Sequence, residues 1–181
     1  RAAKRPVILM GRVSRSEASW AARVALAEWL AAPVVTDLKV AAAFPTDHPL
    51  HAAPPGAYLA AEAIAALRDA DVVLALDWVD LAGTLAQAWS DAAVPCVVIN
   101  ATLDAQLARG WSKDHFALPP ADIYFACDPD VVVAELVAAL GPRDAASRAL
   151  PPTRGYPGIA ASPAGSRHLA AVDARDDCMP L

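Results

Sequence analysis

Five short apolar runs, each bounded by turn residues, alternate along this chain with segments of helical length. The expected strands are Pro6–Met10, Val34–Thr36, Val72–Leu76, Pro95–Asn100 and Ile123–Ala126. The runs are continuously apolar and do not alternate with polar residues, which is typical of parallel strands covered on both faces. The chain is therefore predicted to be α/β, a three-layer sandwich around a doubly wound parallel sheet of five or six strands.

Helices are expected over about 16–31, 57–69, 81–90 and 129–140. In the first, Ser14 and Glu17 have the spacing of a capping box, in which each side chain bonds a backbone N–H left unpaired at the helix start. The last is bounded by clear signals: Asp128-Pro129 favours a start, and Gly141-Pro142 favours a stop.

The chain divides in composition near residue 142. Residues 1–142 are expected to form the α/β domain, while 143–181 are rich in Pro and Gly and have no sustained period. The second segment is interpreted as a linker or tail that leads toward a further, missing domain. The start on Arg1 without methionine likewise suggests an excised segment.

Charge and hydropathy exclude several classes of partner. The net charge is −5 and Lys and Arg are scattered, so no basic surface for nucleic acid is expected. No apolar run approaches the roughly 20 residues that span a bilayer, and no signal peptide is recognised. Cys96, Cys127 and Cys178 fit no metal or redox spacing. A cytoplasmic protein with reduced thiols is expected.

Missing motifs constrain the chemistry further. No two glycines lie two residues apart, which excludes the Gly-x-Gly-x-x-Gly dinucleotide turn. A Gly-x-x-x-x-Gly-Lys phosphate loop and a Gly-x-Ser-x-Gly nucleophile elbow are also absent. The four histidines are dispersed, so no metal site is expected, and no catalytic residue is assigned.

Position in the expected sheet nevertheless indicates one crevice. In open parallel sheets, ligands bind beyond the carboxyl ends of the strands, where the strand order reverses. If the strand at 6–10 is central and the strand at 72–76 is its neighbour, their ends form such a crevice. The candidate cofactor-binding residues are Gly11, Arg12, Lys39, Asp77, Trp78 and Asn100.

Each candidate has a functional and a structural interpretation. Arg12 could bind phosphate through its planar fork, Lys39 as a point charge, and Trp78 could offer a stacking face. Alternatively, the two cations are solvated or ion-paired, and Trp78 packs against a neighbouring helix. Asp77 and Asp80 are more typical of loop or helix-start residues than of catalytic acids.

Four blocks resemble the central domain of thiamine-diphosphate-dependent enzymes, the group of acetolactate synthase, benzoylformate decarboxylase and oxalyl-CoA decarboxylase. The most specific runs from Thr36-Asp37-Leu38-Lys39 through His48-Pro49-Leu50. The opening strand and turn at 6–12 and the runs at 70–76 and 97–100 resemble other parts of the domain, and the likeness covers about residues 4–141.

Three departures from the family pattern fall in the crevice. Val40-Ala41-Ala42 stands where many members have Gly-Lys-Gly, Asp77 where they have glycine, and Asn100-Ala101-Thr102 where they have an Asp-rich turn. In members that bind FAD or ADP, these strand ends surround the nucleotide. The departures predict weak nucleotide binding or none.

The resemblance implies a central structural domain of an enzyme acting on 2-oxo acids, acetolactate-synthase-like or a decarboxylase. Thiamine diphosphate and magnesium would be bound elsewhere in the parent, because the Gly-Asp-Gly…Asn-Asn motif and the activating glutamate are absent here. Other domains of the same polypeptide and a homo-oligomer are the implied partners. The alternatives are an independent FAD- or ADP-binding module and a free-standing enzyme using Asp77 or Asp80.

Overall fold

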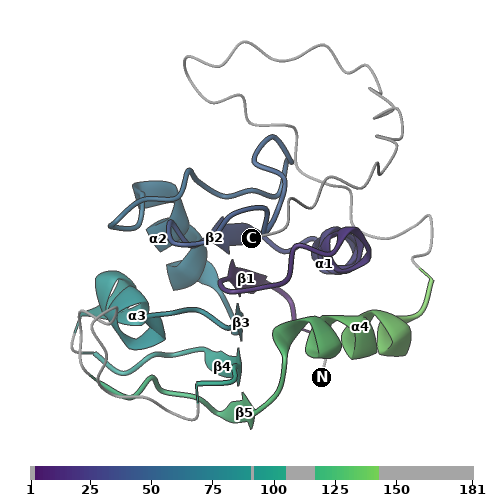
Figure 1. Ribbon diagram of the computed structural model, residues 1–181. Helices are drawn as coiled ribbons and strands as arrows, with labels where there is room; N and C mark the ends of the chain where they lie inside the picture. The colour runs from purple at the N-terminus through teal and green to yellow at the C-terminus, as the bar shows by residue number, and fades with distance from the viewer. Residues whose placement is uncertain (1–2, 91, 105–116, 143–181) are drawn as a thin grey trace, which may run out of the picture.

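Five parallel strands form one sheet in the computed structural model, which describes residues 3–90, 92–104 and 117–142. The strands are β1 (Pro6–Met10), β2 (Val34–Thr36), β3 (Val72–Leu76), β4 (Val97–Ala101) and β5 (Ile123–Phe125). Their order in the sheet is β2-β1-β3-β4-β5 (Figure 1). The strand order therefore reverses between β1 and β3, and the predicted doubly wound parallel sheet is confirmed.

Helices cover the sheet on both sides, which completes the expected three layers (Figure 1). They are α1 (Glu17–Leu30), α2 (Ala61–Asp69), α3 (Leu81–Trp89) and α4 (Pro129–Leu140). α1 and α4 lie on one side and α2 and α3 on the other. The expected helix starts and ends agree with these bounds to within a few residues.

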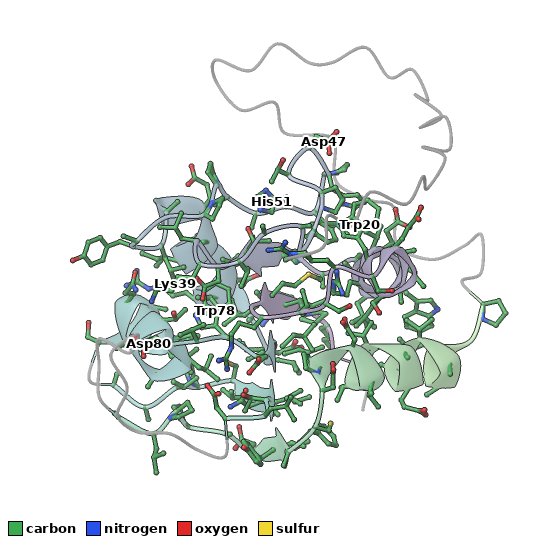
Figure 2. The ribbon with its side chains drawn as sticks, viewed as in Figure 1. Trp20, Lys39, Asp47, His51, Trp78 and Asp80 are labelled. Atoms are coloured by element: carbon green, nitrogen blue, oxygen red, sulfur yellow. The ribbon has the colours of Figure 1, made fainter. Side chains whose placement is uncertain are left out.

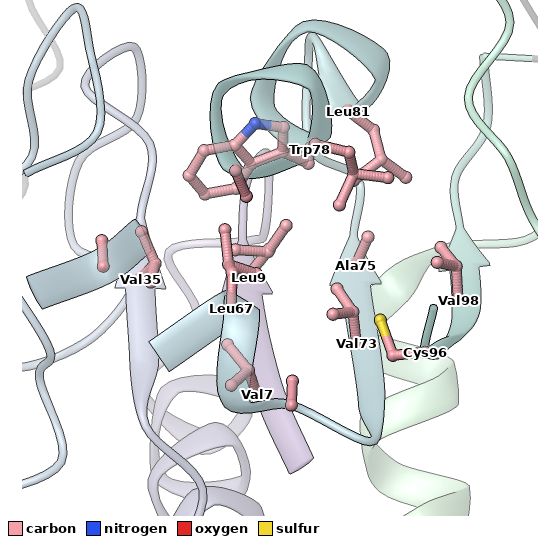
Figure 3. Close-up of a cluster of buried hydrophobic side chains, with 14 of the residues drawn as sticks. Val7, Leu9, Val35, Leu67, Val73, Ala75, Trp78, Leu81, Cys96 and Val98 are labelled. Atoms are coloured by element: carbon pink, nitrogen blue, oxygen red, sulfur yellow. The ribbon is translucent and has the colours of Figure 1, made fainter. Parts of the chain in front are cut away.

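Alternation along the central strand β1 supplies both cores, because successive side chains of a strand point to opposite faces. Val7 and Leu9 pack with Leu67 and Trp78 on the side of α2 and α3 (Figure 3). The intervening residues Ile8 and Met10 belong to the core on the side of α1 and α4. All five residues of β1 are buried, as its continuous apolar run predicts.

The predicted capping box at Ser14 is wrong by two residues. Ser16 is the N-cap of α1, and its Oγ accepts a hydrogen bond from Ser19 N at 3.4 Å. Ser14 lies outside the helix, and its carbonyl oxygen accepts a hydrogen bond from Arg23 Nη2 at 3.0 Å. At α4 the expected signals hold: Asp128 caps the helix and Pro129 is its first residue.

The edge strand β5 departs from the expectation that strands are covered on both faces. Ile123 and Phe125 are each 43% exposed. α4 does not cover them, because its buried residues Val132 and Val133 share a core with residues of β3 and β4 instead.

The connection after β2 is packed onto the sheet edge. Val34 N donates to Leu50 O at 2.7 Å, and Ala52 N donates to Val34 O at 2.8 Å, so residues near His51 pair locally with β2 in parallel. His51 is buried and its Nε2 lies 3.0 Å from Thr36 Oγ1. Burial lowers the pKa of His51 because the protonated ring is poorly solvated there.

Two expectations concern residues outside this description. The proposed linker at 143–181 lies wholly outside the described residues, and much of the long connection at 101–121 does too. Within the described part of the chain, no helix is long and apolar enough to cross a bilayer.

Candidate functional site

The candidate crevice lies where the carboxyl ends of β1 and β3 meet. β1 and β3 pair directly, with Met10 opposite Leu76, so the turns that follow them are neighbours. Gly11 and Arg12 leave β1, and Asp77 and Trp78 leave β3. The predicted adjacency of these four residues is confirmed, and it places them at the point of strand reversal where open α/β sheets bind ligands.

Main-chain hydrogen bonds continue between the two turns beyond the strands. Gly11 N donates to Leu76 O at 2.9 Å, and Arg12 N donates to Asp77 O at 2.9 Å. A side chain on Gly11 would meet backbone: its Cβ would lie 2.5 Å from Asp77 C and 2.6 Å from Trp78 Cα. The two turns are therefore in direct contact, and the space between their backbones is filled by the protein itself.

The side chains of the two turns form an ion-paired cluster. Arg12 Nη2 lies 2.8 Å from Asp77 Oδ1 and 2.6 Å from Asp104 Oδ2. The buried Asp77 carboxylate also accepts a hydrogen bond from Thr102 Oγ1. Burial alone would lower the pKa of Arg12, but the hydrogen bonds to Asp104 and Asp77 outweigh it and raise that pKa. The Arg12 guanidinium thus bridges two carboxylates.

Asp77 has a left-handed backbone, with φ of 51°. This conformation costs a residue with a side chain roughly 1–2 kcal/mol relative to glycine. A glycine, which the family pattern has at this position, would therefore suit the backbone conformation as well as the close approach of a ligand. In this chain the bonds from Arg12 and Thr102 hold the aspartate in place.

The remaining loop candidates have mainly structural contacts. Trp78 is buried over α3, and its Nε1 donates to Thr84 Oγ1 at 2.7 Å, so its ring offers no open stacking face (Figure 3). Asp80 is the N-cap of α3 and accepts a hydrogen bond from Gly83 N. Lys39 is exposed in the loop after β2, and its backbone N donates to Asp37 Oδ1 (Figure 2).

Asn100 is a buried polar residue of β4, opposite Tyr124 of β5 in the parallel register. Its Oδ1 and the hydroxyl of Tyr124 are both buried, and neither has a hydrogen-bond partner among the described residues. Asn100 lies on β4 beside β3, opposite Ala75, and the next residue, Ala101, accepts a hydrogen bond from Asp77 N at 2.7 Å, so Asn100 borders the crevice on the β3 side.

These residues do not fit a diphosphate. Anionic ligands are held by unpaired cations and free backbone N–H groups, whereas Arg12 is ion-paired and its N–H is bonded to Asp77. Two carboxylates also face the same position. Among the described residues, no group of three or more His, Cys, Asp or Glu is arranged to hold a metal ion.

A shallow cavity of about 270 Å³ lies away from the crevice, beside β2 and α2. Its walls include Pro33, Pro49, His51 and Ala66, with Glu62 among the lining residues. Because these walls are mainly apolar and belong to the packed connection after β2, the cavity provides no second phosphate site.

Sequence reasoning missed one buried charged pair. Arg23 is fully buried, and its Nη1 lies 2.6 Å from Asp130 Oδ1 of α4. The available signal was its position three and four residues before Leu26 and Ala27, the other buried residues of α1. Asp104, which completes the crevice cluster, was also missed.

The family comparison decides the assignment. Residues 1–105 match the family described as "Thiamine pyrophosphate enzyme, central domain", which is more than half of the chain. This chain belongs to that family. Its matched region contains β1 to β4 and both turns of the candidate crevice, so the resemblance noted in the sequence is confirmed.

Individual relatives share parts of this chain. An acetolactate synthase of Mycobacterium avium is 43% identical over 76 residues, which are 41% of this chain and 12% of that protein. A candidate thiamin diphosphate-dependent enzyme of Mycobacterium smegmatis has the same fold, with a TM-score of 0.57 and 21% identity over 86% of this chain. A 4-hydroxybenzoylformate decarboxylase of Rhodococcus jostii RHA1, which is also thiamine diphosphate-dependent, has a TM-score of 0.54 and 20% identity and covers 88% of this chain. The chain spans 28% of the length of each of these two structures.

Proposed function

We propose that this chain is the structural central domain of a larger thiamine-diphosphate-dependent enzyme that acts on 2-oxo acids, either acetolactate-synthase-like or a decarboxylase. The observation that carries the proposal is the family match over residues 1–105. The closed, ion-paired crevice supports it, since such a crevice suits a scaffold better than a catalytic centre.

The rest of the enzyme would supply the chemistry. Thiamine diphosphate and magnesium would bind to other domains of the same polypeptide, with residues 1–142 as scaffold and 143–181 as the connection to the next domain. The family implies thiamine diphosphate, and the described residues provide neither a metal cluster nor a fit for a diphosphate. The proposed parent is a cytoplasmic homo-oligomer.

The isolated 181-residue chain is expected to bind no thiamine diphosphate. The reason is that Arg12 is paired with two carboxylates and the Gly-Asp-Gly…Asn-Asn segment is absent. Titration calorimetry with magnesium checks this, with the full-length Rhodococcus decarboxylase as a positive control. Saturable, magnesium-dependent binding to the chain, or a complete reading frame without that segment, contradicts the proposed function.

The alternative, an independent FAD- or ADP-binding module, predicts tight nucleotide binding. We expect dissociation constants no tighter than the high micromolar range, because the Asp77 carboxylate faces the crevice. One pair of like charges at about 5–6 Å, with an effective dielectric near 20, costs about 3 kcal/mol, or roughly a hundredfold in affinity.

Asp77→Gly is therefore expected to strengthen ADP binding by about tenfold to a hundredfold. The change removes the carboxylate, frees Arg12 from one partner and suits the left-handed backbone. Thr102→Val is the matched control, because it removes the other hydrogen bond to Asp77 but keeps the charge. Titration calorimetry compares the variants. Stoichiometric flavin on the purified chain, or an Asp77→Gly variant that binds no better than the control, would show that the carboxylate does not limit binding.

A further inference from the structure

The connection after β2 returns to the sheet edge as a strap, which we define as residues 44–52. Its last residues pair with β2: Val34 N donates to Leu50 O at 2.7 Å, and Ala52 N donates to Val34 O at 2.8 Å. Its apolar members Phe44 and Leu50 belong to the core on the side of α1 and α4. The strap therefore pairs with the edge strand and completes part of the core.

Two imidazole rings hold the strap to different elements. His51 is buried, with its Nε2 3.0 Å from Thr36 Oγ1 of β2, and its ring is also hydrogen-bonded to the backbone of Thr46. His48 Nε2 lies 3.2 Å from Glu28 Oε1 of α1. The strap is thus held to β2 and to α1 by two side chains that can gain a proton.

The hydrogen bonds of His48 define where its proton lies. Its Nδ1 accepts a hydrogen bond from Leu50 N at 3.1 Å. A backbone N–H can only donate, so Nδ1 carries no proton, and the proton of the neutral ring is on Nε2, toward Glu28. A second proton on Nδ1 would break the bond to Leu50, whose carbonyl oxygen accepts the hydrogen bond from Val34 N.

His51 lies where a positive charge is poorly solvated. It is 3% exposed, and it lines the shallow cavity beside β2 and α2 together with the apolar residues Pro49 and Ala66 (Figure 2). Burial lowers the pKa of His51; the hydrogen bond to the Thr46 backbone opposes this effect, and the neighbouring His48 adds to it. Because the cavity is shallow, protons from the solvent reach the ring.

We propose that the strap is a proton-sensitive closure of the sheet edge. Neutral His51 holds residues 44–52 against β2, and protonation of its ring favours an open strap in which the imidazolium is hydrated. The geometry that carries this inference is the bond between His51 and Thr36, flanked by the two backbone bonds to Val34. The inference goes beyond the proposed function and does not depend on it.

The charged groups around the strap have partners of their own or face water. Glu28 is paired with His48, and Asp37 Oδ1 accepts a hydrogen bond from Lys39 N. Glu62 of α2 lines the same cavity as His51 but is exposed. The titratable and charged groups of the surrounding elements are Arg23 and Glu28 of α1, Asp37 after β2, Asp47 and His48 of the strap, and Glu62 of α2.

Proton linkage gives the sign and size of the effect. An exposed histidine has a pKa of about 6.5, so His51 of an open strap gains a proton below about pH 6.5, whereas the buried ring, with its lowered pKa, gains it only at lower pH. The contribution of His51 to closure is therefore fully present above about pH 6.5 and is lost as the pH falls through the pKa of the closed strap. One proton changes the closing equilibrium by up to about tenfold at about pH 5.5.

Amide exchange of the 181-residue chain, followed by NMR at about pH 7.5 and about pH 5.5, tests the proposal. The Ala52 N–H reports on the strap, and the Gly11 N–H, which bonds Leu76 O at 2.9 Å, reports on the central strands. After correction for intrinsic exchange rates, the protection of Ala52 is expected to fall about fivefold to tenfold at the lower pH. The protection of Gly11 should change less than about twofold. The His51 ring should titrate over the pH range in which Ala52 loses protection.

Two variants assign the effect to one ring. His51→Gln removes the titration but keeps an amide that can bond Thr36 Oγ1. Its Ala52 protection is expected to change less than about twofold between the two pH values. His48→Gln is the matched control, because it removes the other imidazole of the strap and keeps His51. Its Ala52 protection should still fall at the lower pH.

Several results would overturn the inference. Unchanged protection of Ala52 in the wild-type chain means that the strap does not respond to protons. An equal loss in His51→Gln, or its disappearance in His48→Gln, assigns the response to another group. A parallel loss at Gly11 means that the whole domain unfolds in acid. If His51→Gln leaves Ala52 unprotected at both pH values, the wild-type ring decides, because titration of His51 outside the range in which Ala52 loses protection contradicts the proposal.

Discussion

Replacing Gly11 with alanine is expected to cost the domain about 3–5 kcal/mol of unfolding free energy, at the upper end for a single substitution. The new Cβ would lie 2.5 Å from Asp77 C and 2.6 Å from Trp78 Cα, and closer still to the Asp77 carbonyl oxygen. All of these are backbone atoms of the turn after β3. No side-chain rotation relieves the overlap, so the turns after β1 and β3 must separate and lose their mutual hydrogen bonds.

Gly141→Ala is the matched control for this prediction. Gly141 has φ of +69°, and nothing lies within 4 Å of a Cβ built there. Its alanine variant should lose about 1–3 kcal/mol, because φ of 69° with ψ of −170° is a backbone region that is essentially restricted to glycine. Urea unfolding, followed by circular dichroism, compares the two midpoints. Similar losses in both variants would mean that close contact between the turns does not limit substitution at Gly11.

The sheet was predictable because its signal is local. Continuous apolar runs separated by helix-length segments fix the number of strands, and parallel crossovers then place the ends of β1 and β3 together. This reasoning from the sequence alone predicted that Arg12 and Asp77 lie at the same crevice, and the two are in contact. It also identified Trp78 as a residue that either stacks on a ligand or packs on a helix.

The rest depended on contacts between distant residues. An arginine in a helix is usually solvated, and nothing near Arg23 in the sequence indicates a partner 107 residues away. α1 begins after Ser16, two residues later than predicted, and the carbonyl of Ser14 outside the helix accepts a hydrogen bond from Arg23. The exposure of Phe125 could not be predicted from the sequence either, because an apolar run has the same composition whether or not a helix covers it.

The buried arginine gives the second large expected effect: Arg23→Met should cost about 3–5 kcal/mol of unfolding free energy. Arg23 Nη1 lies 2.6 Å from Asp130 Oδ1, Nε donates to Ala43 O at 3.0 Å, and Nη2 donates to Ser14 O at 3.0 Å. Removing the guanidinium leaves the carboxylate of Asp130 largely buried without its cation. It also leaves the buried carbonyl oxygen of Ala43 without its donor, which costs further free energy.

Asp130→Asn should lower the free energy of unfolding at neutral pH. It should also change how that free energy depends on pH under acidic conditions. Burial alone would raise the pKa of Asp130, but hydrogen bonds from Ser14 and Arg23 outweigh it and hold that pKa below the usual 3.8. Because the pKa of Asp130 is lower in the folded state than in the unfolded state, its ionised carboxylate stabilises the fold. This contribution is fully present above about pH 3.8 and is lost as the pH falls through the folded-state pKa. The asparagine variant lacks this titration, so its stability should fall less steeply between about pH 5 and pH 2.

A double-mutant cycle separates the pair from its surroundings. The double variant Arg23→Met, Asp130→Asn should lose less unfolding free energy than the sum of the two single losses. Each single variant leaves one buried group without its partner, whereas the double variant contains neither charge. The exposed pair Arg5–Asp69, at 3.3 Å, serves as a control that should show little coupling because solvent screens it. Additive losses at Arg23 and Asp130 would mean that the two residues stabilise the fold independently. A strong coupling would instead show that one buried ion pair joins α1 to α4 and holds these two helices together.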